Sequence, residues 1–150
     1  MPRQRGRERT NEFLVGVVGT SRRNAICSRE ARTVLEEAIE LLVGDKAIVI
    51  VSGGGLVPMT AFDIAKQKHW KAIQVVCPKV KCSPQRVHRI EIGKKHGDES
   101  AEFINMIDGI IRIGGGPQSH REVKMFTEQK GNGKEAIVIE KEVALLPTGQ

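Results

Sequence analysis

Short apolar runs alternate along the chain with longer segments in which apolar residues recur at helical spacing. The apolar runs occupy residues 13–19, 46–52, 71–77, 108–114 and 135–140. Runs of this kind, bounded by polar or glycine-rich stretches, are typical of strands that are buried on both faces. The segments between them predict helices within residues 27–44, 56–68, 98–107 and 117–130.

This alternation predicts an α/β fold. Parallel strands joined by helices through right-handed crossovers leave few possible topologies. We expect a single doubly wound, Rossmann-like domain over residues 13–150, with a five-stranded parallel sheet. The expected order is 3-2-1-4-5, with the strands numbered along the chain. Residues 87–97 show no clear pattern.

Glycine-rich loops follow three of the predicted strands. The loops read GTSRRN after the first strand, SGGG after the second and GGGPQS after the fourth. In an open parallel sheet, ligands bind beyond the carboxyl ends of the strands where the strand order reverses. In the expected order this crevice lies between the first and fourth strands, so the three loops meet there.

The residues of these loops favour an anionic ligand. With Pro117 at the first helical position, Gly116 becomes the cap and the amides of Gln118 and Ser119 remain open donors. The same reasoning, with Pro58 at the first helical position, predicts a second open helix start at residues 55–59. Arg22 and Arg23 add guanidinium groups suited to phosphate. A tight turn without a ligand is the alternative for any single loop.

The distribution of basic residues suggests a further candidate function. The net charge of the 150 residues is +6, and residues 1–9 (MPRQRGRER) supply +3 of it, from four Arg and one Glu. We expect residues 1–12 to form a flexible basic tail, because they contain few apolar residues that could anchor them. Nucleic-acid binding through this tail is therefore a candidate function. With no signal peptide or membrane-spanning run in the sequence, we expect a cytoplasmic protein without a membrane partner.

The three cysteines are Cys27, Cys77 and Cys82, and their odd number favours reduced thiols. Cys77 and Cys82 with His88 form an incomplete zinc-like set, for which no fourth ligand is evident. We predict no metal and no cofactor. The sequence also lacks a Walker A motif, a G-x-G-x-x-G dinucleotide motif and a G-x-S-x-G serine elbow.

Two stretches resemble a known family. VSGGGLVPMTAFDIA is similar to the first glycine motif of Lonely Guy (LOG) and lysine-decarboxylase-like proteins, with Met59 on the early helical Met. IGGGPQSHRE resembles their motif Pro-Gly-Gly-x-Gly-Thr-x-x-Glu, which aligns Ser119 with Thr and Glu122 with Glu. IDGIIRIGGG is close to the molybdenum-cofactor carrier branch of the same SLOG superfamily. The resemblance covers residues 13–140.

Departures from the motifs separate two functions. Gln118 replaces a family glycine, Gly114 stands where hydrolytic members have proline, and the Met-His-x-Arg-Lys motif is absent. The resemblance implies a nucleotide-binding cleft, in which the chain acts as a carrier or sensor. The alternative is hydrolysis of the N-glycosidic bond of a nucleoside 5′-monophosphate, with Glu122 and Arg89 as catalytic residues. Helix-dipole stabilisation by Glu122 is an equal alternative to its catalytic role. The family also implies a homo-oligomer.

The predicted site combines the loops with the family resemblance, and its partner is a small phosphorylated, nucleotide-like ligand. The predicted ligand-binding residues are Gly19, Thr20, Ser21, Arg22, Gly53, Gly54, Gly55, Met59, Gly114, Gly115, Gly116, Gln118 and Ser119.

Overall fold

A computed structural model describes residues 12–20, 28–44, 47–81, 83–130 and 137–142. Several sequence predictions lie outside these residues. They concern the basic tail before Glu12, the loop residues Ser21, Arg22 and Arg23, and the thiols of Cys27 and Cys82.

The sheet contains six parallel strands in the order β4-β3-β2-β1-β5-β6. The strands are β1 Glu12–Gly19, β2 Ala47–Ser52, β3 Lys71–Val76, β4 His88–Glu91, β5 Gly109–Ile113 and β6 Val138–Lys141. The predicted fold class and the order of the five predicted strands are confirmed. The strand count is corrected by one, because β4 adds to the edge beside β3.

Edge strand β4 is four residues long, and its sequence, HRIE, alternates polar and apolar side chains only weakly. A strand with one partner needs few buried side chains, so its pattern is faint. It pairs with β3 from Ile73–His88 to Val76–Glu91.

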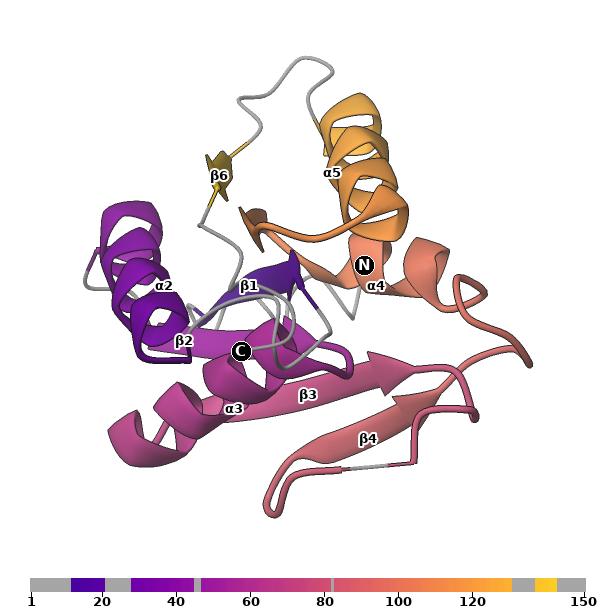
Figure 1. Cartoon of the computed structure of the whole chain (residues 1–150), viewed down its shortest axis with the longest axis horizontal. Coiled ribbons are helices and arrows are strands. Elements are labelled where there is room, and N and C mark those ends of the chain that lie inside the picture. Colours follow the sequence, from indigo (N-terminus) through magenta and orange to yellow (C-terminus); the bar gives the residue numbers. More distant parts are fainter. Residues whose placement is uncertain (1–11, 21–27, 45–46, 82, 131–136, 143–150) are drawn as a thin grey trace, which may run out of the picture.

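Helices cover both faces of the sheet (Figure 1). They are α2 Ser28–Val43, α3 Leu56–Lys68, α4 Ser100–Met106 and α5 Pro117–Lys130. Alternate residues of each strand point to opposite faces. Val15 and Val17 of β1 pack with α2 and α3 in one core cluster, while Val18 belongs to a second cluster with residues of α4 and α5.

The ends of β1 and β5 approach closely at Gly19. Gly19 pairs with Ile113, and a Cβ at Gly19 would lie 2.2 Å from the Ile113 carbonyl oxygen. Any larger residue would force the two strands apart at this point. The crevice predicted between these strands therefore begins at a contact that requires glycine.

Helix α3 begins two residues earlier than predicted. It starts at Leu56, and Pro58 is its third residue rather than its first. Gly55, with a φ of 112°, makes the turn from the loop into the helix. A positive φ of this size favours glycine, so Gly55 and not Pro58 sets the start of the helix.

Within the described residues, no helix combines the length and apolar character needed to cross a membrane.

Candidate functional site

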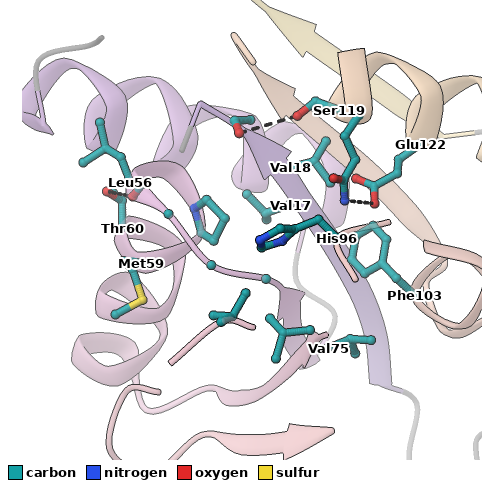
Figure 2. A pocket seen from close by; sticks show the side chains of 18 of the residues that line it. Val17, Val18, Leu56, Met59, Thr60, Val75, His96, Phe103, Ser119 and Glu122 are labelled. Carbon is teal, nitrogen blue, oxygen red and sulfur yellow. Dashed lines mark hydrogen bonds between the residues drawn. The ribbon is translucent and has the colours of Figure 1, made fainter. Parts of the chain in front are cut away.

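A cleft of about 1350 Å³ opens at the carboxyl ends of the strands (Figure 2). Its floor is apolar and includes Val17, Val18, Val75 and Val76. Both predicted glycine motifs reach it. The predicted site residues that line the cleft are Gly19, Gly53, Gly54, Gly55, Met59, Gly116, Gln118, Ser119 and Glu122. The place where the strand order reverses, between β1 and β5, thus coincides with a cavity large enough for a nucleotide.

Thr20 connects the two glycine motifs instead of lining the cleft. Its hydroxyl accepts a hydrogen bond from the Gly115 amide at 3.1 Å. Its carbonyl accepts a hydrogen bond from the Val57 amide of α3 at 3.0 Å, and its own amide donates to the Ile113 carbonyl at 3.2 Å. Thr20 is buried. Its predicted role in ligand contact is therefore replaced by a structural one.

The start of α5 faces the cleft. The first bond of the helix runs from the His120 amide to the Gly116 carbonyl, 3.2 Å apart. The amides of Gln118 and Ser119 precede it, and so they have no acceptor within the helix, while Pro117 carries no N–H. These two amides and the positive end of the helix dipole suit an anion.

Gly114 and Gly115 shape the turn before α5 and do not line the cleft. Their φ angles are 62° and 97°. A Cβ at Gly115 would lie 2.6 Å from Ser119 Oγ, so this glycine allows the turn to fold back on the helix. Gly116 differs, because a Cβ there would meet nothing within 4 Å. The open space beside Gly116 is the approach to the helix start.

The second predicted helix start, at residues 55–59, is not open as expected. The Val57 amide donates to the Thr20 carbonyl, and the Met59 amide donates to the Gly55 carbonyl at 2.9 Å. Pro58 has no N–H, so Leu56 carries the one remaining amide of the first turn. The prediction of an open helix start here was wrong on this point. The carbonyl of Thr20, just after β1, already accepts the hydrogen bond of the Val57 amide at the start of α3.

Two buried carboxylates form one wall of the cleft. Gln118 Nε2 lies 3.2 Å from Glu122 Oε2 and 3.2 Å from Glu99 Oε2, and donates to both. The hydroxyl of Ser100 donates to Glu122 Oε2 at 2.7 Å. Burial raises the pKa of the Glu122 carboxyl, the hydrogen bonds from Ser100 and Gln118 oppose this, and the negative charge of Glu99 adds to it.

The turn at residues 93–99, which contains Gly93 and Gly97, places Glu99 at the cleft. The Asp98 carboxylate accepts hydrogen bonds from the amides of Lys94 and Lys95 at 2.8 and 3.0 Å, and these bonds lower its pKa. His96 of the same turn lines the cleft near Phe103 (Figure 2), with its Nδ1 3.6 Å from the sulfur of Cys77. The turn up to Gly97 lies within the stretch that showed no sequence pattern, whereas Asp98 and Glu99 stood in the predicted helix.

Three cationic side chains that were not predicted line the cleft, while the predicted Arg22 and Arg23 lie outside the described residues. Arg29 and Arg32 of α2 and Lys81 line it. Arg32 Nη1 donates to Asp63 Oδ2 of α3 at 2.9 Å, and both side chains belong to the lining. We call Arg29, Arg32 and Lys81 the cationic rim. The helical periodicity of α2 did not distinguish these arginines from ordinary solvent-facing residues.

Arg89 does not line the cleft, which corrects its assignment as a catalytic residue. Its guanidinium donates to Glu91 Oε2 at 2.8 Å, to Ser83 Oγ at 2.7 Å and to the Val80 carbonyl. These bonds engage both ends of the guanidinium fork. Arg89 thus fastens the segment after β3, which brings Val80 and Lys81 to the cleft.

The sequence showed an incomplete zinc-like set, for which no metal was predicted, and its Cys82 lies outside the described residues. Cys77 is buried beside His96, whereas His88 is exposed on the edge strand β4. No group of three or more His, Cys, Asp or Glu side chains suited to a metal occurs in the part of the chain that the structure describes.

Comparison with known proteins yields a structural match. No known protein family matches the sequence, and no curated protein sequence matches it. The crystal structure of TM1055, target VT76 of the Northeast Structural Genomics Consortium, superposes with a TM-score of 0.63. The match covers 78% of this chain and 69% of that chain, at 16% sequence identity. The chain therefore shares its Rossmann-like α/β fold with TM1055.

Proposed function

We propose that this protein binds a nucleotide or a nucleotide-linked metabolite in the cleft, as a carrier or sensor, with a phosphate at the start of α5. The observation that carries the proposal is the opening of α5 into a large cleft. Gln118 and Ser119 supply amides without helical acceptors, and Gly116 leaves their approach unobstructed.

The rest of the cleft fits the remainder of such a ligand. The apolar floor and the ring of Phe103 offer a surface for a nucleobase. The side chains of Glu99 and Glu122 offer hydrogen-bonding groups to sugar hydroxyls, and the cationic rim offers charge to further phosphates. The resemblance of the two glycine motifs to the LOG and SLOG sequences supports the same ligand class.

The test is calorimetric titration with AMP, used as the simplest probe of phosphate, sugar and base together. We expect saturable binding, and we expect Gly116→Val to weaken it at least about tenfold, because the new side chain fills the approach to the helix start. Ala101→Val is the matched control, since Ala101 is exposed and outside the cleft lining. Equal affinity in the two variants, or no binding by the wild type, contradicts the proposal.

A second candidate function is hydrolysis of a nucleoside 5′-monophosphate to free base and ribose 5-phosphate. The observation that favours it is the buried Glu122, which lies one helical turn from Ser119 in the cleft wall. A carboxylate in that place is suited to stabilise an oxocarbenium-like ribose or to orient water. Chromatography of AMP incubated with the protein would reveal free adenine. Turnover that Glu122→Gln abolishes supports the hydrolase, and binding without adenine release supports the carrier.

A further inference from the structure

The carboxyl of Glu122 is held asymmetrically. Ser100 Oγ and Gln118 Nε2 both donate to the same oxygen, Oε2, at 2.7 and 3.2 Å. No described residue donates to the other oxygen, Oε1. Every fully buried side-chain nitrogen and oxygen in the described residues has a hydrogen-bond partner, so Oε1 is not fully buried, and the side chain to which it belongs lines the cleft.

This asymmetry determines where a proton sits. Oε2 is occupied by two donors, and a third hydrogen directed at it would collide with them. A proton on Glu122 is therefore carried by Oε1, where it points into the cleft. In this form Glu122 is a neutral hydrogen-bond donor, and in the charged form it is an acceptor only.

The surroundings of Glu122 favour the neutral form. Glu99 shares the Gln118 amide with it and places a second negative charge beside it. Burial is the main cause that raises the pKa of Glu122, and the hydrogen bonds from Ser100 and Gln118 and the charge of Arg121 oppose it. The floor of the cleft that β1 contributes is uncharged and consists of Val17 and Val18. His96 lines the same cleft from the turn before α4.

We propose that Gln118 orients the carboxyl of Glu122 and that Glu99 favours its protonated form, which donates its proton from Oε1 into the cleft, toward an acceptor atom of the bound metabolite. Glu99 supplies the neighbouring charge, and Gln118 links the two carboxyls and fixes which oxygen faces the ligand. Neither residue needs to touch the ligand for this role. The inference rests on the proposed function only for the identity of the ligand.

A phosphate at the start of α5 strengthens the effect. It would lie about one helical turn, roughly 5.4 Å, from Glu122. A negative charge at that distance favours the protonated carboxyl. Ligand binding and protonation of Glu122 are therefore linked, with the sign that binding takes up a proton and weakens as the pH rises through the pKa of Glu122.

The first experiment needs no ligand. The protein, labelled with ¹³C at the glutamate side-chain carboxyls, is titrated with acid, and the Glu122 signal is assigned by its loss in Glu122→Gln. We expect it to titrate above its usual value of 4.5. Glu99→Gln should lower this pKa, and Gln118→Met should raise it by removing a donor to the charged form. Glu102→Gln is the matched control, because Glu102 is an exposed carboxylate of α4.

The titration overturns the inference if Glu122 titrates at or below 4.5, or if Glu99→Gln leaves its pKa unchanged. It is also overturned if Glu102→Gln lowers the pKa as much as Glu99→Gln, since a general loss of surface charge would then explain the shift. Circular dichroism spectra identify any variant that fails to fold.

The second experiment uses AMP, titrated by calorimetry in buffers of different ionisation enthalpy across a pH series. We expect the wild type to take up more protons than Glu122→Gln, with affinity falling by up to about tenfold per pH unit where Glu122 titrates. The phosphate of AMP titrates in both proteins, so the difference between them isolates Glu122. Binding with equal proton uptake in both overturns the inference and leaves the proposed function standing. Absence of AMP binding contradicts the proposed function, and the carboxyl titration still decides the inference.

Discussion

The hydroxyl of Thr20 accepts a hydrogen bond from the amide of Gly115, although the two residues are 95 positions apart in sequence. Through its carbonyl, Thr20 also holds the Val57 amide of α3. One buried threonine thus joins the loops after β1, β2 and β5. The glycine motifs that line the cleft keep their separation because they share this residue.

Thr20→Val should lower the free energy of unfolding by about 1–3 kcal/mol, because the Gly115 amide loses its acceptor in a buried place. Valine keeps the branched shape and the backbone carbonyl, so the hydroxyl alone is tested. Urea denaturation gives the measurement. Thr20→Ser retains the hydroxyl and should recover much of the loss. Similar stabilities of the valine and serine variants would show that this hydrogen bond does not secure the loops.

The adjacent glycines Gly115 and Gly116 should differ in how strongly their replacement by alanine lowers stability. Gly115→Ala places a Cβ 2.6 Å from Ser119 Oγ at a φ of 97°, and should destabilise the protein by about 1–3 kcal/mol. Gly116→Ala meets no atom within 4 Å, and should change stability by less than about 1 kcal/mol. Thermal unfolding of both variants under the same conditions compares them directly. A larger loss at residue 116 than at residue 115 would contradict this account of the turn.

Glu122→Gln should increase stability at neutral pH. Burial raises the pKa of Glu122 above its usual 4.5. The contribution of the protonated Glu122 carboxyl to stability is therefore fully present below pH 4.5 and is lost as the pH rises through the raised pKa. Glutamine accepts from Ser100 and Gln118 with its carbonyl and carries no charge. Urea denaturation at a series of pH values should show the variant more stable at pH 7, with the difference closing below pH 4.5. A constant difference would exclude titration of Glu122 as its cause.

Arg112→Met should destabilise the protein by about 1–3 kcal/mol. The buried guanidinium donates to Glu140 Oε1 at 2.8 Å, to Glu142 Oε2 at 2.5 Å and to the Gly114 carbonyl at 2.7 Å. Its removal leaves that carbonyl without this donor just before the start of α5. Equilibrium unfolding in urea gives the measurement, and Lys124→Met, at an exposed cation of α5, is the control.

The same contact has a pH signature. Hydrogen bonding to Arg112 lowers the pKa of Glu142 below its usual 4.5. The stability from this pair is therefore present above pH 4.5 and is lost as the pH falls through the lowered value. Acid titration of stability should show this loss in the wild type and not in Arg112→Met. An identical acid profile in the two proteins would mean that the pair contributes nothing.

The fold was predictable because most of its strands are apolar runs too short for helices, bounded by polar or glycine-rich residues and alternating with segments of helical spacing. Val15, Val17 and Val18 of β1 pack into both core clusters, as a strand covered on two faces requires. Strand β4 escaped prediction because its HRIE sequence is polar and lies at the edge, where burial leaves little trace.

The site was predictable where it depends on backbone and less so where it depends on side chains. Gly116 and Gln118 were predicted because glycines and a proline between a buried strand and a helix place helix-start amides at the carboxyl end of the sheet. His96 was missed because it lies in a stretch without periodicity, and Glu99 because it stood in a predicted helix, whereas the structure places it in the turn before α4. Arg89 was chosen through family resemblance, yet its guanidinium is occupied by Ser83, Glu91 and a carbonyl.

The Thr20 carbonyl accepts the hydrogen bond of the Val57 amide and so makes the two ends of the cleft unequal as anion sites. A ligand with one acidic group meets open helix-start amides at one end of the cleft, the start of α5. We therefore expect it to bind in a single orientation. A second acidic group on the same molecule would have to rely on the side chains of the cationic rim, because the start of α3 leaves no second set of helix-start amides open to it.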